Sequence, residues 1–363
     1  MKILHVYKDY DPILGGIENH MKWLAEAQAA AGHEVTVLVT NPAKLPKYEQ
    51  QGGVFIIRAW RLATVASTPL SPEMPFKLPQ IQADIVHLHS PYPVGEMSQL
   101  LRGGKRPYVI TYHSDVVKQQ TVLRFYRPFL KRVLDRAAQI IVSNDNYIHS
   151  SEYLRPLAAK CTVIPFAVDV ARFQTAIPSL PPTDVPTFIF VGAHRYYKGV
   201  DDLLRAMVDV NGRCLIGGDG PRRAEWEALA HELHITGKVQ FLGKIPDEEL
   251  PRFFAAGDVF VLPSNSRAES FGIVLQEAMA AGRPCVTTEL GTGTSWLVQD
   301  GVSGLVVPPQ NPEALAAALN RLAADADLRG RMGKAGQQRA AAEFTMERML
   351  SRIDTVYLQA LEK

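Results

Sequence analysis

The chain has 363 residues, 47% of them hydrophobic and 21% charged, which is the composition of an ordinary globular protein long enough for two domains. Its 39 Lys and Arg residues nearly balance 37 Asp and Glu residues, so the formal net charge of +2 gives no reason to expect a nucleic-acid partner. Three separated cysteines without a CxxC pair exclude a disulfide framework and a thiolate zinc site.

The same features favour a cytoplasmic location. Residues 1–9 turn polar too early for a signal peptide, and no run of about 18 apolar residues occurs. We therefore expect neither export nor a membrane span.

Short apolar runs alternate with amphipathic stretches along the chain, which is typical of α/β domains with parallel sheets. The first half predicts a helix over 17–31 and strands at 3–7, 35–39, 54–58, 85–89, 108–112, 139–142 and 161–164. Prolines at 178, 181, 182 and 186 break helices and central strands, so we place a domain boundary there, between domains 1–175 and 176–345. The pattern restarts with strands at 188–191, 213–216, 239–242, 259–262, 285–287 and 304–307.

Two doubly wound domains in succession imply a cleft between them, and ligands of such sheets bind beyond the carboxyl ends of the strands. Gly15 and Gly16 lie between the first strand and the first helix, where glycine allows close approach of a ligand and the helix N-terminus favours an anion. The alternative is a simple tight turn. The pattern is not the GxGxxG fingerprint, and no P-loop occurs.

His113 follows the strand 108–112 and is expected at the edge of the sheet that binds ligands. Its imidazole can donate or accept a proton near neutral pH. We favour a functional role for His113, whereas His87 and His89, inside the strand 85–89, fit a structural role.

Arg195 and Lys198 follow the first strand of the second domain, beside Gly192 and Gly199. Such a cation pair suits a diphosphate, because fixed positive charge stabilises the negative charge that develops on a leaving nucleoside diphosphate. The alternative is a solvated surface loop.

Glu269 and Glu277 bracket an expected helix start near Phe271. The free N–H groups of Gly272, Ile273 and Val274 would then form an anion site. Glu277, about two turns into the helix, could accept the hydroxyls of a ribose, and Glu269 could reach a neutral sugar.

Asp9-Tyr10-Asp11 has the DxD form that holds a divalent cation against a diphosphate. The pattern is short and recurs at 325–327. With Arg195 and Lys198 available, we expect no metal and no other cofactor.

The segment 118–136 is locally basic. It carries Lys118, Arg124, Arg127, Lys131, Arg132 and Arg136 against one acid, Asp135. Val122, Tyr126, Phe129, Val133 and Ala137 form an apolar stripe at helical spacing, and Arg124, Arg127 and Lys131 lie roughly opposite. Pro128 is expected to split or kink the helix. A core helix with a solvated back explains this pattern. The sharper alternative is peripheral contact with an anionic membrane or a lipid-diphosphate acceptor.

Together these motifs resemble glycosyltransferase family 4, retaining enzymes of the GT-B fold. Glu269 and Glu277 have the spacing of the family's E-x7-E signature, and the segments 217–221 and 300–309 resemble two further family motifs. The resemblance implies an α/β protein with two facing Rossmann-like domains, and it covers essentially the whole chain. Ala193 departs from the family, many members of which have Arg directly after the glycine.

The resemblance assigns roles to the candidate residues. Arg195 and Lys198 would bind the donor diphosphate, with Gly16 approaching it from the first domain. Glu277 would bind the ribose, Ile245 would lie by the nucleobase, and Glu269 and His113 would contact the transferred sugar. The helix near 346–363 would cross back to the first domain.

We therefore expect a retaining hexosyltransferase that uses a nucleotide-diphosphate sugar and a glycan or lipid-linked glycan acceptor. The segments 112–115, 126–128 and 196–199 resemble those of bacterial mannosyl- and related transferases, which favours GDP-mannose as the donor. The alternatives are a UDP-sugar-dependent transferase, a nucleotide-sugar epimerase or hydrolase, and a non-catalytic nucleotide-sugar-binding protein.

Overall fold

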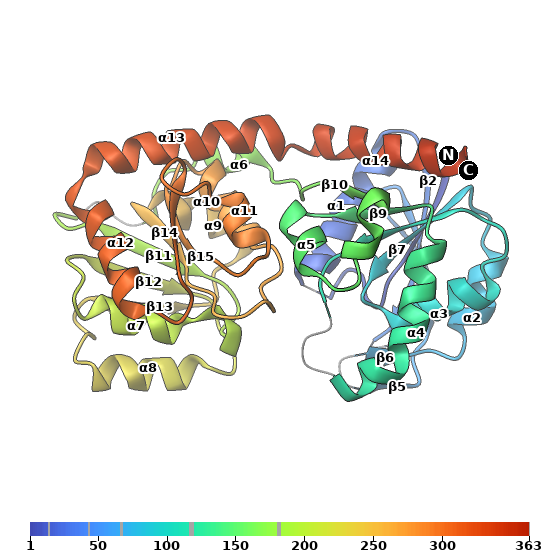
Figure 1. Cartoon of the computed structure of the whole chain (residues 1–363), viewed down its shortest axis with the longest axis horizontal. Coiled ribbons are helices and arrows are strands. Elements are labelled where there is room, and N and C mark those ends of the chain that lie inside the picture. The colour runs from blue at the N-terminus through green and yellow to red at the C-terminus, as the bar shows by residue number, and fades with distance from the viewer. Residues whose placement is uncertain (14, 43, 66–67, 116–119, 180–182, 363) are drawn as a thin grey trace. The chain divides into compact units, whose positions relative to one another are not determined.

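The computed structural model describes residues 1–362 apart from 14, 43, 66–67, 116–119 and 180–182, and of 120–125 it describes only the backbone. The chain divides into two compact units (Figure 1). Unit 1 comprises Met1–Phe166 and Met346–Lys363, and unit 2 comprises Ala167–Thr345.

Unit 1 is built on an eight-stranded sheet among the described residues, in the order β10-β9-β8-β7-β1-β2-β4-β3. Its strands are β1 (Lys2–Val6), β2 (Glu34–Asn41), β3 (Tyr48–Gln51), β4 (Val54–Trp60), β7 (Ile85–Ser90), β8 (Tyr108–Tyr112), β9 (Gln139–Val142) and β10 (Cys161–Val163). All neighbours run parallel except β3, which pairs antiparallel with β4. In a separate two-stranded sheet, β5 (Ala63–Val65) pairs antiparallel with β6 (Thr68–Leu70). Apolar residues of neighbouring strands fill the core, such as Leu4, Val37 and Ile110.

The helices of unit 1 cover this sheet. They are α1 (Gly16–Ala30), α2 (Met74–Lys77), α3 (Pro93–Arg102), α4 (Gln120–Arg136), α5 (Asp145–Ser150) and α14 (Met346–Leu361), with 3₁₀ turns at Leu78–Gln80 and Arg155–Lys160. The C-terminal helix α14 packs against α1, β7 and β8 (Figure 1). The end of the chain is therefore part of the first unit, as the family resemblance implied.

Unit 2 is built on a six-stranded parallel sheet among the described residues, in the order β13-β12-β11-β14-β15-β16. Its strands are β11 (Thr187–Val191), β12 (Arg213–Gly217), β13 (Val239–Gly243), β14 (Val259–Leu262), β15 (Cys285–Thr288) and β16 (Gly304–Val307). Its helices are α6 (Val170–Gln174), α7 (Val200–Met207), α8 (Arg223–Glu232), α9 (Leu250–Ala255), α10 (Ile273–Ala280), α11 (Gly293–Leu297), α12 (Pro312–Ala324) and α13 (Ala326–Glu343), with 3₁₀ turns at Tyr196–Lys198 and Asp247–Glu249. In chain order this is the 3-2-1-4-5-6 arrangement of a doubly wound fold, with its switch point between β11 and β14.

The division between the units falls after Phe166 rather than at the proline-rich segment, after residue 175. The intervening residues pack on unit 2: the Val168 N–H donates to the Phe344 carbonyl (2.8 Å), and the Phe173 ring lies edge-on to that of Phe254 (5.6 Å between centroids). Pro178 and Pro186 thus belong to unit 2, ahead of β11, and Pro181 and Pro182 lie outside the described residues.

Helix α4 differs from its prediction in two respects. Gln120–Arg136 is one helix that contains Pro128, so the proline does not split it. Phe129 is 44% exposed, whereas Leu130 and Leu134 are buried with Tyr126 and Val133. The buried stripe is thus rotated toward Leu130 and Leu134. Val122 and Arg124 have side chains outside the described residues, as does Lys118.

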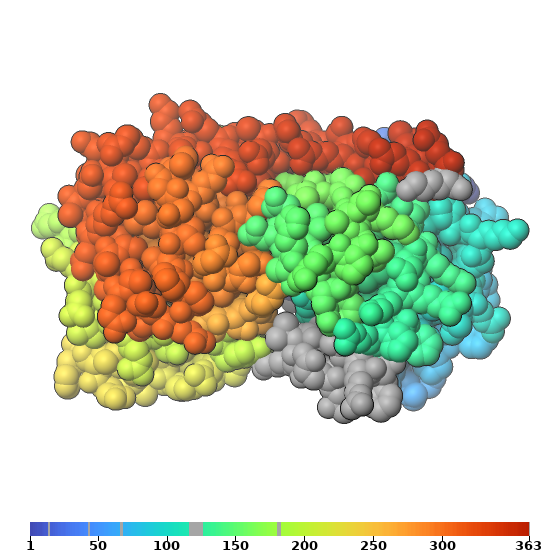
Figure 2. Space-filling model, in the orientation of Figure 1, coloured from blue at the N-terminus to red at the C-terminus, as the bar shows by residue number. Residues whose placement is uncertain are grey.

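The C-terminal half of α4 lies at the surface of unit 1, on the face seen in Figure 2. Arg127 pairs with Glu152 (2.6 Å). Lys131, Arg132 and Arg136 are exposed and form no ion pair with a described residue.

Candidate functional site

The site in unit 2 begins at its switch point, where β11 and β14 lie side by side. The loop after β11 carries Lys198, and the loop after β14 carries Glu269. Because the carboxyl ends of parallel neighbours share one edge of the sheet, these residues, 71 positions apart in sequence, come together.

Lys198 and Glu269 form an ion pair. The Lys198 Nζ donates to Glu269 Oε2 at 2.6 Å, and the Ser264 hydroxyl donates to the same oxygen at 3.1 Å. Both charged residues are only 8% exposed. The other carboxylate oxygen, Oε1, takes part in neither bond. The site therefore offers a ligand the Lys198 ammonium as a fixed cation and, next to it, the Glu269 Oε1 atom as a hydrogen-bond acceptor.

Two glycines allow the loops of this site to pack together. Gly199 has φ +63°, and a Cβ there would lie 2.0 Å from the Pro263 carbonyl oxygen. Gly218 has φ +112°, and a Cβ there would lie 1.9 Å from the Gly192 carbonyl oxygen. A side chain at either position would force the loops apart.

Ile245 lies near the same edge of the sheet, beside the end of β12. A Cβ on Gly217 would lie 2.9 Å from its Cγ1. Ile245 is half-buried and Lys244 is exposed, so the turn after β13 offers an apolar side chain next to the glycine-rich end of β12.

Helix α10 begins at Ile273, two residues later than predicted, because Gly272 is its N-cap with φ +88° and ψ +60°. The N–H groups of Ile273 and Val274 lie in its first turn, where no partner within the helix exists. Glu277 consequently lies about one turn into the helix, not two.

Glu277 is 9% exposed. Burial raises its pKa to about 7, the negative charge of Asp247 adds to the effect, and the positive charge of Arg172 opposes it. Arg172 is itself paired with Asp247 (2.9 Å). Glu277 therefore changes its charge near neutral pH.

Arg195 is not brought into this group. Its side chain is exposed and makes no hydrogen bond or ion pair with a described residue, although its carbonyl accepts a bond from the Lys198 N–H (3.0 Å). Binding of a donor diphosphate by Arg195 stays a prediction.

The unit 1 candidates lie at the carboxyl edge of that unit's sheet. Gly16 is the first residue of α1, which follows β1. His113 follows β8, and its N–H donates to the Ser90 carbonyl at the end of β7 (2.9 Å). His113 is buried, and burial holds the pKa of its imidazole well below the usual range.

The surroundings of His113 were not predicted from the sequence. Its Nε2 lies 3.0 Å from Nδ1 of His89, and His89 in turn contacts His5. The i, i+2 spacing of His87 and His89 places both on one face of a strand and was the available signal. Their assignment as structural residues left the connection to His113 unseen.

Both carboxylates of the Asp9-Tyr10-Asp11 motif form ion pairs within unit 1. Asp9 pairs with Arg61, and Asp11 pairs with Lys22 (2.9 Å). At the second DxD sequence, the Asp325 carboxylate caps α13 by accepting the Leu328 N–H.

No helix among the described residues is both long and apolar enough to cross a lipid bilayer.

Comparison with known proteins shows that these two doubly wound units have the GT-B fold of glycosyltransferases. The chain is similar along 99% of its length to a sucrose-phosphate synthase structure from Thermosynechococcus elongatus, with 26% identity, a TM-score of 0.82 and 99% of that chain covered.

Comparison of the sequence with known families and proteins shows which family the chain belongs to. Residues 14–172 match the model of Glycosyltransferase Family 4, and residues 173–339 match that of Glycosyl transferases group 1. The chain is 35% identical to O-antigen chain mannosyltransferase C of Escherichia coli over 100% of its own length and 99% of that protein. It is 34% identical to D-rhamnosyltransferase WbpZ of Pseudomonas aeruginosa, over 95% and 92% respectively. The protein belongs to glycosyltransferase family 4.

Proposed function

We propose that this glycosyltransferase moves a hexose from a nucleotide-diphosphate sugar, GDP-mannose in the first instance, to a hydroxyl of a glycan or lipid-linked glycan, with retention of anomeric configuration. The observation that carries the proposal is the buried pair of Lys198 and Glu269 at the switch point of unit 2. The mannosyltransferase and rhamnosyltransferase relatives support a hexose or deoxyhexose donor.

The chemistry assigned to the site needs no metal. Lys198 and the first turn of α10 stabilise the negative charge that grows on the departing diphosphate. Glu269 accepts hydrogen bonds from the transferred sugar, and Glu277 binds the ribose. The bond between the anomeric carbon and the phosphate oxygen breaks on the face where the acceptor oxygen bonds to that carbon. The acceptor's hydroxyl proton passes to the leaving phosphate oxygen.

The donor is tested by the thermal stability of the protein with GDP, UDP and ADP sugars. A bound donor at 100 times its Kd stabilises the fold by about 2.7 kcal/mol. GDP-mannose should raise the Tm of the protein. If only UDP sugars raise the Tm, the donor is a UDP sugar and not GDP-mannose. UDP is included because a structure of Anabaena HepE, 20% identical with a TM-score of 0.79, is a complex with UDP.

The variant Glu269→Ala distinguishes a catalyst from a protein that only binds the donor. We expect turnover to fall by at least a hundredfold, while the Kd for the donor rises much less, because the sugar contact matters most as charge develops. A variant that keeps full function whenever it binds donor would indicate a non-catalytic binding protein. Epimerisation of the donor without an acceptor would indicate an epimerase.

We also propose that α4 contacts anionic lipid peripherally. Lys131, Arg132 and Arg136 are exposed beside the partly exposed Phe129. Reversal of all three charges to Glu should abolish flotation with phosphatidylglycerol vesicles. The control is the same reversal at Arg321, Arg331 and Lys334, exposed residues of α12 and α13 in unit 2. Unchanged flotation of the α4 variant would rule out this contact.

A further inference from the structure

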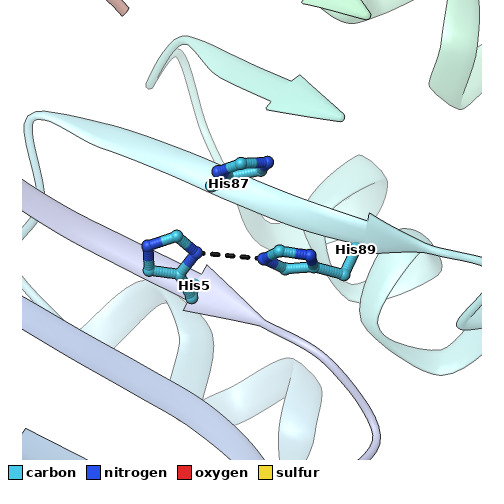
Figure 3. A group of neighbouring side chains, drawn as sticks. All are labelled: His5, His87 and His89. Carbon is cyan, nitrogen blue, oxygen red and sulfur yellow. Dashed lines mark hydrogen bonds between the residues drawn. The ribbon is translucent and has the colours of Figure 1, made fainter. Parts of the chain in front are cut away.

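A group of buried histidines lies on two neighbouring strands of the unit 1 sheet. His5 on β1 pairs in register with His87 on β7, and His89 lies two residues further along β7. Figure 3 shows His5 and His89 pointing toward one another from these neighbouring strands. All three rings are fully buried.

Hydrogen bonds connect two of these rings, His5 and His89, to His113 in one chain. The Gln28 Oε1 lies 2.7 Å from His5 Nε2, and His5 Nδ1 lies 3.0 Å from His89 Nε2. His89 Nδ1 lies 3.0 Å from His113 Nε2. The chain thus runs from α1 through two strands to the carboxyl edge of the sheet.

Each ring in the chain is neutral near pH 7. Burial lowers the pKa of His5 to about 4 and holds the pKa values of His89 and His113 well below the usual range. A neutral imidazole has one N–H donor and one acceptor nitrogen, so a bond made at one nitrogen decides what the other can do.

The direction of the chain follows from Gln28. Its amide NH₂ donates to the Tyr357 hydroxyl of α14 (3.2 Å), so its carbonyl oxygen faces His5 and can only accept. His5 therefore carries its proton on Nε2 and accepts at Nδ1. By the same step His89 donates from Nε2 to His5 and accepts at Nδ1 from His113.

The last atom of this chain has no partner. With its proton on Nε2, His113 has a lone pair on Nδ1, and that buried nitrogen bonds to no described residue. We infer that Gln28, His5 and His89 are positioning residues that hold His113 in the Nε2–H tautomer, so that Nδ1 accepts a hydrogen bond from a substrate hydroxyl. The substrate part of this inference rests on the proposed function.

A metal site is the competing interpretation, since nitrogens of His5, His87 and His89 lie within 4.8 Å of one another. Every ring nitrogen of these residues already has a partner, however. His87 lies 2.6 Å from both the Tyr357 hydroxyl and the Thr111 hydroxyl. A metal would have to replace these bonds, so the hydrogen-bonded chain is the better account.

The test is the tautomer of His113, read from two-bond ¹H–¹⁵N spectra of histidine-labelled protein near neutral pH. The signal is assigned by its loss in His113→Gln. We expect Nδ1 in the unprotonated range and Nε2 in the protonated range in the wild type. A proton on Nδ1 would overturn the inference, whether or not any variant folds.

Two variants of one strand form a matched pair. His89→Phe cuts the chain, and we expect a mixture of His113 tautomers. His87→Phe removes two hydrogen bonds of an equally buried ring that is not between Gln28 and His113, and it should leave the tautomer unchanged. Gln28→Met gives a second cut if His89→Phe does not fold. The inference would be overturned if the His113 tautomer stayed unchanged in folded His89→Phe or Gln28→Met protein. It would also be overturned if one equivalent of Zn²⁺ shifted the signals of His5, His87 and His89.

Activity provides the separate test of substrate contact. In a working transferase, His89→Phe should lower kcat about tenfold, with little change in the donor KM, whereas His87→Phe should stay within about threefold. A wild type that transfers no sugar would refute the proposed function and leave the tautomer result standing. Equal kcat values in the two variants would remove the substrate contact from the inference.

Discussion

Among single residues, Glu277 makes donor binding depend on pH. Its pKa is raised to about 7, so the carboxyl is protonated below that value in the free protein. A carboxylate that accepts ribose hydroxyls must be ionised, and binding below pH 7 then releases a proton. We expect the donor Kd to rise toward tenfold for each pH unit below 7 and to be constant above it.

Calorimetric titration with an intact nucleotide sugar measures this effect, because its diphosphate has no group that titrates near neutrality. Glu277→Gln is the control and should give a weaker Kd with no pH dependence. A flat profile in the wild type would contradict the ribose contact of an ionised Glu277.

The pairing of Lys198 with Glu269 makes a second prediction. Lys198→Ala leaves a buried carboxylate without its cation, and we expect the free energy of unfolding to fall by about 3 kcal/mol. Lys198→Ala combined with Glu269→Ala should recover part of that loss, since both charges are gone. The exposed Arg195 is the control, and Arg195→Ala should change the unfolding free energy by less than about 0.5 kcal/mol in urea denaturation. Additive losses from the two single variants would mean that the pair is not coupled.

The sequence pointed to individual site residues more readily than to their partners. Lys198 and Glu269 stand out because each follows an apolar run beside glycine or serine. Their ion pair depends on which strands are neighbours, and that order is not visible in local patterns. The contact between His5 and His89 spans 84 positions and was missed for the same reason.

At the scale of elements, α14 secures the C-terminal segment to unit 1 by its buried face. Ile353 is 2% exposed on that face, whereas Leu358 is 56% exposed. Ile353→Ala should lower the free energy of unfolding by about 2–4 kcal/mol, because it leaves a cavity against the unit. Leu358→Ala should change it by less than about 0.5 kcal/mol. Equal effects in thermal or chemical unfolding would contradict this packing.

Strands with a continuous apolar run were predicted well. The bounds expected for 108–112, 139–142, 259–262 and 304–307 are those observed, because buried parallel strands are apolar on both faces. The edge strand β3 was missed, since Tyr48–Gln51 is a polar segment that is only partly buried. Its place in the sheet depends on its antiparallel pairing with β4.

For the whole molecule, the buried histidines predict acid sensitivity. Their folded pKa values lie below the usual 6.5, so the unfolded chain binds more protons once the pH falls below that value. Each such histidine contributes stability that is present above pH 6.5 and is lost as the pH falls toward its folded pKa, about 4 for His5. We expect a loss on the order of 1 kcal/mol per pH unit for each histidine.

Urea denaturation across this pH range measures the slope. His5→Asn should make it shallower, while His231→Gln, at an exposed position of α8, should leave it unchanged. A wild-type slope equal to that of His5→Asn would contradict neutral burial of the ring.

The proposed reaction is transfer of a hexose from a nucleotide sugar with retention of anomeric configuration. The most direct measurement is the anomeric configuration of the new glycosidic bond, followed by proton NMR as GDP-mannose reacts with a lipid-linked glycan acceptor. We predict that the product has the configuration of the donor and that Glu269→Ala forms it at least a hundredfold more slowly. A product of the opposite configuration, or no transfer from any nucleotide sugar that stabilises the protein, would contradict the account.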